Sequence, residues 1–405
     1  MKRIYTIPSL LVCLLLFLAA CNSNKTFTPE SVGVSSDTLE LASMRMQEYI
    51  DSGKLAGIST IVMKNGKIVQ NAYFGFADIE KKQPVEENTL FRIFSMTKPI
   101  TTVALMTLFD EGKFKLDDKV STYIPEFEGM LVYTPNDNGF TLEPQVNEMS
   151  IRNLLTHTSG IPYGWDQASY VDSIYRVSGV GSWDSTTIGD KVKMLAKIPL
   201  KFQPGAKWEY GLSIDVAGYL VEVLSGMPLD IYFKTKILDP LKMNETSFYV
   251  SEDKLNRFAE LYHTDSLGKL QANKFMGDAF KKPTTLFWGG AGLVSTLNDY
   301  ARFCSMMLNG GELDEVRILQ ESTTKLIMSN QLPVGVIYGE DNGYGLGGSV
   351  DLKTGEYSWG GAADTKFWID PAHDMIIVTY TQLMPSDDSY AKDFKDIVLK
   401  SLISN

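Results

Sequence analysis

The sequence predicts an α+β fold: an antiparallel sheet of five or more strands, flanked by terminal helices and packed against an all-helical subdomain. Near the N-terminus, the apolar segments 58–63 and 67–74 flank Asn65-Gly66, a strong two-residue hairpin signal. Strand-like segments return near the C-terminus, at 357–359, 366–369 and 375–382. Helical segments and long loops occupy about 116–286 between them. We therefore expect one sheet-based domain with a helical insertion and a site in the cleft between the two parts.

The first 20 residues resemble a bacterial lipoprotein signal. Lys2 and Arg3 precede an apolar stretch, 10–20, that is short for a membrane-spanning helix and ends at Cys21. We expect lipidation of Cys21 and a place in the bacterial cell envelope, periplasmic or surface-exposed, with this anchor as the only membrane contact. The alternative is a plain secretory signal. Residues 21–35 would form a tether and residues 36–405 the folded domain.

Helical spacing predicts the terminal helices and an internal one. Residues 36–52 place Leu39, Ala42, Met46 and Ile50 on one side. Residues 390–402 are amphipathic in the same way. The apolar helix 297–308 contains Cys304, which we expect in the core; with Cys13 removed and Cys21 lipidated, no cysteine is left to form a disulfide with it.

Composition excludes several kinds of protein. The formal charge of −11, without a basic stripe, argues against nucleic acid as a partner. The three histidines form no H-E-x-x-H or cysteine–histidine pattern, so we expect neither a metal nor another cofactor. No G-x-S-x-G occurs, which disfavours an α/β-hydrolase. Residues 343–348 satisfy G-x-G-x-x-G but lack a following helix, so the match is a coincidence.

A serine and a lysine three residues apart, Ser95 and Lys98, begin an apolar helical run that continues to Phe109. This spacing places both on one helix face. A buried lysine can lose its proton near neutral pH and accept the serine proton. The alternative is a serine N-cap beside an exposed lysine. Four further S-x-x-K matches lie in polar or loop-like stretches, where we expect no chemistry: Ser251/Lys254, Ser266/Lys269, Ser322/Lys325 and Ser389/Lys392.

Two other segments carry candidate groups. A turn at 204–209 delivers Tyr210, whose phenol could pass protons, although a packing role is the commoner one for a tyrosine. Trp359-Gly360-Gly361-Ala362 places paired glycines in a strand, which implies close approach of another group to the backbone. The literal K-T-G at 353–355 looks like a hairpin turn instead.

These three motifs, in this order, resemble the serine β-lactamase and penicillin-binding-protein superfamily. The resemblance is strongest to the class C β-lactamase-like branch that includes the family VIII carboxylesterases, and covers about 36–402. It implies Ser95 as acyl-enzyme nucleophile, Lys98 as its activating partner and Tyr210 as general acid/base, with the backbone N–H groups of Ser95 and Ala362 as oxyanion hole. Further matching segments are 154–161 (LLTHTSGI), 289–296 (GGAGLVST) and 368–371 (WIDP).

Two positions depart from the class C pattern. Leu212 stands where Y-x-N has asparagine, and Trp359 stands where K-T-G has lysine. A substrate carboxylate without that cation loses about 1.5–3 kcal/mol, or about tenfold to a hundredfold in binding. We therefore expect a carboxylesterase acting through Ser95 on a small-molecule ester. Alternatives are a peptidase, penicillin-binding or weak β-lactamase activity on cell-wall-type amides, and a non-catalytic peptidoglycan-binding or sensor lipoprotein.

Overall fold

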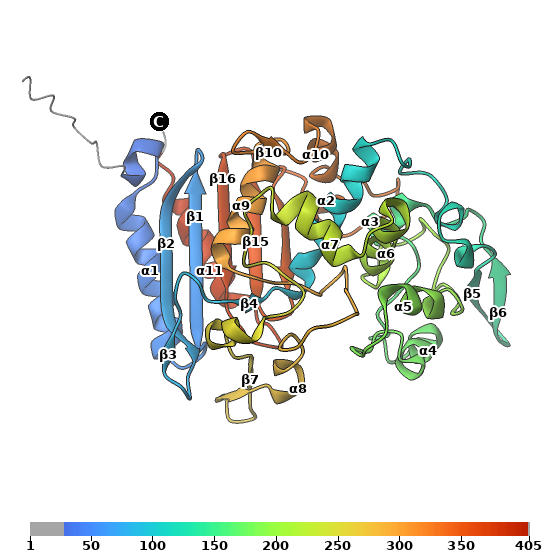
Figure 1. The fold of residues 1–405 in the computed structure, drawn as a ribbon, viewed down its shortest axis with the longest axis horizontal. Helices are drawn as coiled ribbons and strands as arrows, with labels where there is room; N and C mark the ends of the chain where they lie inside the picture. The colour runs from blue at the N-terminus through green and yellow to red at the C-terminus, as the bar shows by residue number, and fades with distance from the viewer. Residues whose placement is uncertain (1–27, 404–405) are drawn as a thin grey trace, which may run out of the picture.

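A computed structural model of the chain describes residues 28–403. Its central element is an antiparallel sheet of eight strands in the order β12-β13-β14-β15-β16-β1-β2-β3 (Figure 1). The sheet strands are β1 (Gly57–Lys64), β2 (Lys67–Asp78), β3 (Gln83–Pro84), β12 (Asn342–Tyr344), β13 (Ser349–Asp351), β14 (Tyr357–Gly361), β15 (Thr365–Asp370) and β16 (Met375–Tyr380). Because β1 pairs with β16, the two ends of the chain build one sheet, as predicted.

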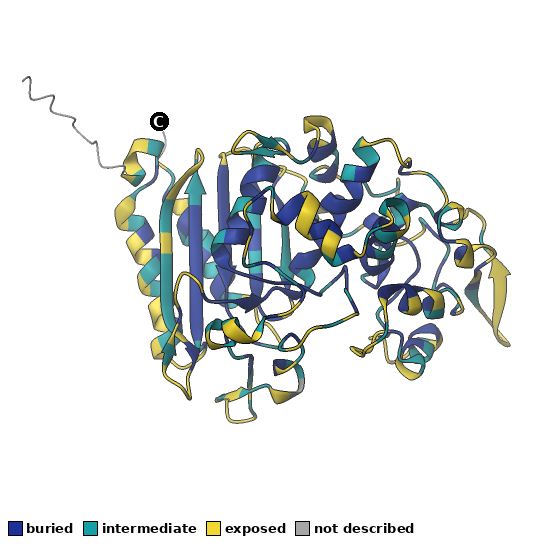
Figure 2. Cartoon of the chain, in the orientation of Figure 1, coloured by how far each residue is buried: buried dark blue, intermediate teal, exposed yellow. Residues whose placement is uncertain are grey.

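Both faces of this sheet are covered by helices. The terminal helices α1 (Ser36–Asp51) and α11 (Ser389–Lys400) lie against one face, where their apolar sides and strand residues form a separate core. Helix α9 (Leu297–Leu308) contacts β16, β1 and β15 on the other face, and Cys304 is fully buried there. The central strands are accordingly buried (Figure 2).

The second part of the molecule packs beside the sheet around helix α2 (Thr97–Asp110), which contacts α6 and α7. Its helices are α3 (Ile151–Leu155), α4 (Tyr170–Ser178), α5 (Ile188–Leu195), α6 (Ser213–Ser225), α7 (Leu229–Phe233) with a π-helical continuation (Lys234–Leu238), and α10 (Glu321–Ile327). The one-turn helix α8 (Lys274–Gly277) lies apart from them, below the sheet in Figure 1. Among the described residues no single helix is long and apolar enough to span a membrane; α6 and the segment to Leu238 pass this test only together, bent by 80°.

The prediction that the insertion is all-helical is wrong. Between 116 and 286 the chain forms two hairpins, β5 (Leu131–Asn136) with β6 (Gly139–Pro144), and β7 (Tyr262–Thr264) with β8 (Leu270–Ala272). The first projects from the body, and every residue of β6 is exposed although Phe140 and Leu142 alternate with Thr141 and Glu143 (Figure 2). Two-stranded pairs β4 (Phe91–Arg92) with β9 (Val294–Ser295) and β10 (Glu312–Leu313) with β11 (Val316–Arg317) complete the strands.

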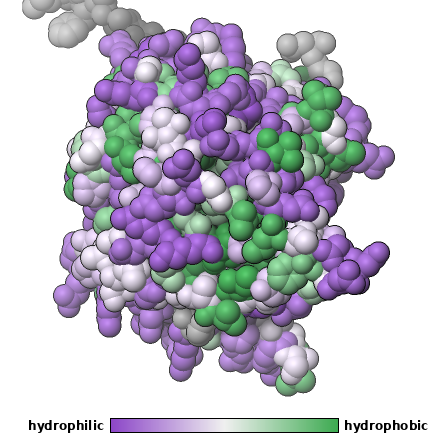
Figure 3. Space-filling view, turned by 90° about the vertical axis from the view of Figure 1, so that its right-hand side faces the viewer, coloured by the Kyte–Doolittle hydropathy of each residue, from purple (hydrophilic) through white to green (hydrophobic). Residues whose placement is uncertain are grey.

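The end of the molecule that carries the β5–β6 hairpin exposes several large apolar side chains. Figure 3 looks onto this end and shows apolar groups gathered among hydrophilic ones. Phe140 of the hairpin is 40% exposed and contacts Tyr170 of α4, with ring centroids 4.6 Å apart. This aromatic contact holds the hairpin against α4.

The N-terminal boundary of the folded domain differs from the predicted one. Residues 1–20 and Cys21 lie outside the described residues. Within the predicted tether, however, Pro29–Val32 form a 3₁₀ helix and Val34 is fully buried, forming a bridge with Leu402. The Ser35 N–H donates to the Ser401 carbonyl. The folded domain therefore includes the described residues from Pro29 onward, because Val34 completes the core between α1 and α11.

Candidate active site

Ser95 lies at a sharp turn between strand β4 and helix α2, in a short 3₁₀ helix (Phe94–Met96). It is the only residue of 91–100 that is not buried. The preceding residue, Phe94, has φ +40°, a conformation that a bulky side chain rarely adopts. This turn aims the Ser95 side chain away from the core while the helix N-terminus follows directly behind it.

Lys98 is fully buried beside Ser95, as the three-residue spacing predicts. Its Nζ donates to Ser95 Oγ at 3.3 Å, to Tyr163 Oη at 3.0 Å and to the Gly290 carbonyl at 2.7 Å. In none of the other four S-x-x-K matches is the lysine buried. Only at Lys98 is the lysine buried against its serine, so this pair alone has the close, water-excluded contact that the predicted chemistry requires.

Tyr210 lies in the same site, but its hydroxyl does not contact Lys98. Lys98 Nζ lies over the Tyr210 ring, 4.5 Å from its centroid, while the Tyr163 hydroxyl takes the hydrogen bond. Tyr210 Oη is buried and has no hydrogen-bond partner among the described residues. An unpaired buried hydroxyl is costly, so a substrate atom at this position would satisfy it.

Strand β14 brings Trp359-Gly360-Gly361-Ala362 to the nucleophile. A Cβ on Gly361 would overlap the Ile93 carbonyl, and one on Gly360 would lie 2.9 Å from Lys366 Nζ. The paired glycines therefore do admit a close neighbour, as predicted, but that neighbour is the turn before Ser95 and a lysine of β15. This close approach sets Ala362 beside Ser95 on the wall of one cavity.

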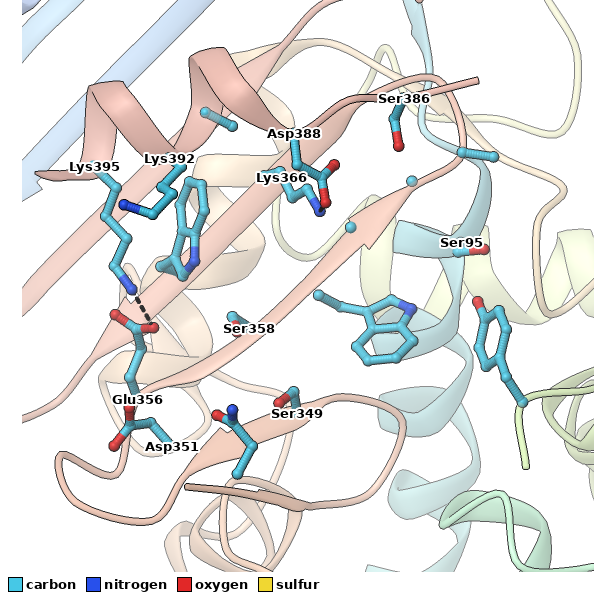
Figure 4. A pocket seen from close by; sticks show the side chains of 18 of the residues that line it. Ser95, Ser349, Asp351, Glu356, Ser358, Lys366, Ser386, Asp388, Lys392 and Lys395 are labelled. Atoms are coloured by element: carbon cyan, nitrogen blue, oxygen red, sulfur yellow. Dashed lines mark hydrogen bonds and ion pairs between the residues drawn. The ribbon is translucent and has the colours of Figure 1, made fainter. Parts of the chain in front are cut away.

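That cavity has a volume of about 770 Å³ and extends from Ser95 along β14 to helix α11 (Figure 4). Aromatic side chains line the end near Ser95: Trp165, Tyr210, Tyr338 and Trp359. The rest of the cavity is polar, and its lysines are paired with acids, Lys366 with Asp388 at 2.9 Å and Lys395 with Glu356 at 2.6 Å. Figure 4 shows the Lys395–Glu356 pair at the far end from Ser95, with Lys366 and Asp388 between that pair and Ser95.

The structure does not place Leu212 in this cavity. Leu212 is 4% exposed, belongs to the main core and stands at the N-cap of α6. The position that carries asparagine in the class C pattern thus contributes packing here. The K-T-G at 353–355 forms the turn between β13 and β14, and no helix follows residues 343–348, as predicted.

His157 orders the turn that carries Tyr210. It is fully buried at φ +54°, its carbonyl accepts from the Glu209 N–H, and its Nδ1 accepts from the Gly211 N–H at 3.4 Å. Burial and the nearby Lys98 hold the pKa of His157 well below its ordinary value, so the ring is neutral. It supports Tyr210 from behind, with ring centroids 4.9 Å apart.

Two residues at this site were not predicted. Tyr163, whose pKa is raised well above its ordinary value by burial and then by Tyr210 and Asp215, contacts Lys98. Asp215, 3% exposed in the first turn of α6, accepts the Gly290 N–H at 2.6 Å, and burial raises its pKa to about 6. The sequence holds a signal for Asp215, since a charge within the apolar run 214–221 is rarely buried without a reason.

Comparison with known proteins agrees with this geometry. The Beta-lactamase family pattern matches residues 43–401. Esterase EstB of Burkholderia gladioli is 29% identical over 389 residues, covering 87% of this chain and 94% of its own. An Escherichia coli K12 protein named "Putative D-alanyl-D-alanine carboxypeptidase" is 27% identical, covering 87% and 83%. The structure of EstCE1, "a hydrolase with promiscuous acyltransferase activity", superposes with TM-score 0.77 at 25% identity, covering 89% and 98%.

A serine at a helix N-terminus, hydrogen-bonded to a buried lysine beside a β-strand wall, defines a serine hydrolase. The chain belongs to the Beta-lactamase family. The predicted superfamily, the α+β fold class and the assignment as a serine hydrolase are confirmed.

Proposed function

We propose that this protein is a carboxylesterase that forms an acyl-enzyme on Ser95. The observation that carries the proposal is the contact of Lys98 Nζ with Ser95 Oγ, 3.3 Å, at the wall of a cavity large enough for a small ester. The named relative EstB is an esterase, which supports the same reaction class.

The proposed reaction begins with attack of Ser95 Oγ on the ester carbonyl carbon, while the Ser95 proton passes to the lone pair of an unprotonated Lys98 Nζ, which becomes an ammonium. The carbonyl oxygen becomes an oxyanion, which the N–H groups of Ser95 and Ala362 would stabilise. When the carbon–oxygen bond to the alcohol breaks, the leaving oxygen takes a proton from Lys98 or through the unpaired Tyr210 hydroxyl. Water then attacks the acyl carbonyl, and the reverse proton path frees Ser95.

The wall of the cavity supports an ester over a β-lactam. Trp359 occupies the position of the K-T-G lysine, and its ring packs on Tyr210 with centroids 5.4 Å apart. The nearby cation, Lys366, is already paired with Asp388 at 2.9 Å. A lactam carboxylate would therefore meet an indole instead of a free ammonium, whereas a neutral ester loses nothing there.

The test is hydrolysis of a short-chain p-nitrophenyl ester. We expect turnover by the wild type and none above background for Ser95→Ala. Ser322→Ala, which changes an exposed serine of another S-x-x-K match, is the matched control and should retain full activity. Equal rates for wild type and Ser95→Ala would refute the proposal.

A second candidate, action on a D-amino-acid amide, is favoured by the similarity to the protein named as a carboxypeptidase. Stable labelling of Ser95 by a reporter penicillin would support it, and ester turnover without penicillin labelling would exclude it. The third candidate, a non-catalytic binding protein, predicts no labelling of the folded protein by a fluorophosphonate.

A further inference from the structure

The Lys98 ammonium has no carboxylate in direct contact. Its three hydrogen bonds go to neutral oxygens of Ser95, Tyr163 and Gly290, and no ion pair within residues 28–403 includes it. A fully buried cation with only neutral partners is costly, because the interior solvates charge poorly. A compensating charge nearby would reduce this cost each time Lys98 takes up a proton.

Asp215 supplies a carboxylate that is separated from Lys98 in space by a single residue, Gly290. Its Oδ1 accepts the Gly290 N–H at 2.6 Å, and the carbonyl of the same Gly290 accepts Lys98 Nζ at 2.7 Å. A Cβ on Gly290 would lie 2.5 Å from Asp215 Oδ2, so only glycine admits the carboxylate this closely. Asp215 and Lys98 are therefore joined through a single glycine.

The segment that carries Gly290 is fixed from two helices. Thr101 of α2 donates its hydroxyl to the Gly289 carbonyl at 2.5 Å. On the α6 side, a Cβ on Gly218 would lie 3.2 Å from the Gly289 Cα, which shows how closely that helix packs. With Asp215 holding the next N–H, the Gly290 carbonyl has little freedom, and the position of Lys98 Nζ depends on it.

We propose that Asp215 is a positioning residue for Lys98: it fixes the Gly290 carbonyl that holds Lys98 Nζ against Ser95 and provides the negative charge that the buried ammonium lacks. This role rests on the proposed function of the Ser95–Lys98 pair. It predicts that nucleophile activation requires the charge of Asp215, and not only its hydrogen bond.

The surrounding groups are consistent with this role. Lys98 of α2 is the charged group whose field acts on Asp215, opposing the increase in pKa that burial causes. Tyr163 lies in the loop after α3, and the pKa of its hydroxyl is raised by burial first, and then by Tyr210 and the Asp215 carboxylate. Because the pKa of Asp215 is about 6, the carboxylate is ionised at pH 7–8 and largely neutral at pH 5.

The experiment measures the rate at which a fluorophosphonate labels Ser95, together with p-nitrophenyl ester turnover, in wild type and Asp215→Asn. Asparagine keeps an oxygen acceptor for the Gly290 N–H and removes the charge. At pH 8 we expect both rates to fall about 10- to 100-fold in the variant. The ratio should shrink toward one between pH 6 and pH 5, where the wild-type carboxyl becomes neutral.

The matched control is Asp299→Asn in α9. Asp299 is also a buried carboxyl that accepts a backbone N–H, from Glu245 at 2.8 Å, but it lies outside the cavity and should leave both rates unchanged. Unchanged labelling by Asp215→Asn at pH 8, or a loss equal at pH 5 and pH 8, would overturn the proposal. Labelling that depends on Asp215 in a protein without ester turnover would instead reject only the proposed substrate.

Discussion

Replacing Asp215 with asparagine should make the protein more stable at neutral pH, although the same change lowers its activity. Asp215 is buried, and burial is the largest influence on its carboxyl, raising the pKa from 3.8 to about 6 despite the opposing field of Lys98 and the Gly290 N–H. Its ionised form is therefore less favourable in the folded protein than in water. Asparagine is never ionised and avoids this cost.

The size of the effect follows from the two pKa values. The difference between 3.8 and about 6 corresponds to about 3 kcal/mol. The asparagine amide brings an N–H₂ in place of Oδ2, and leaving it unpaired would cost about 1–2 kcal/mol. We therefore expect a net gain in unfolding free energy of about 1–2 kcal/mol.

The sign of the pH dependence is fixed by the direction of the shift. Between about pH 4 and pH 6 the folded wild type binds more protons at Asp215 than the unfolded chain does, so this group's contribution to stability falls as pH rises. The ionisation cost is absent below about pH 4 and fully present above about pH 6. The advantage of the asparagine variant should appear across this window.

The assay is urea unfolding of wild type and Asp215→Asn at pH 4.5 and pH 8, with the change in unfolding free energy compared at each pH. The difference between the two proteins should increase by about 1–3 kcal/mol in favour of the variant on going from pH 4.5 to pH 8. A variant that is less stable than wild type at pH 8, or a difference that does not change with pH, would refute the reasoning.

Three further predictions address other parts of the chain. Tyr163→Phe removes one neutral hydrogen bond to Lys98 and should lower kcat for ester hydrolysis about tenfold with little change in KM, measured against wild type at pH 8. Trp359→Lys restores the K-T-G cation and should raise the rate of labelling by a reporter penicillin about tenfold or more; an unchanged rate would show that Trp359 does not exclude lactams. Cys21→Ala should abolish the incorporation of labelled palmitate that the wild type shows during bacterial expression, and a wild type without label would favour a plain secretory signal.

Local patterns predicted those parts of the fold that depend on neighbouring residues. The Asn65-Gly66 turn and its flanking strands are present as predicted, because the turn conformation that Asn-Gly favours and the apolar runs beside it depend only on residues close together in the sequence. Helix 297–308 has the predicted bounds, since Thr296 caps it and Asp299 lies at the N3 position that this cap binds. The β5–β6 hairpin was missed although Phe140 and Leu142 alternate with polar residues, because this short alternation lies in a stretch rich in Pro, Asn, Asp and Gly that is also typical of a loop.

The same distinction applies to the site. Ser95 and Lys98 are three residues apart, so helix geometry alone brings them together. The partners of Lys98 come from much farther away, Tyr163 at a separation of 65 residues and Gly290 at 192. Those contacts depend on how α2 packs against α6 and the loop before β9. This packing joins segments that are far apart in the sequence, so no local pattern predicts it.

Asp215 shows what a single sequence can still indicate about such distant contacts. Asp215 lies inside the apolar run 214–221, and residues of such a run are expected in the core, where a charged side chain is unfavourable. The structure shows that the Asp215 carboxyl is buried there, and its raised pKa shows that burial disfavours the ionised form. Lys98 is in the same situation at the start of α2. Lys98 and Asp215 are each unfavourable alone in the core, and their opposite charges, linked through Gly290, partly offset this cost. When a sequence holds one buried lysine, an acidic residue within another apolar helix therefore indicates its partner.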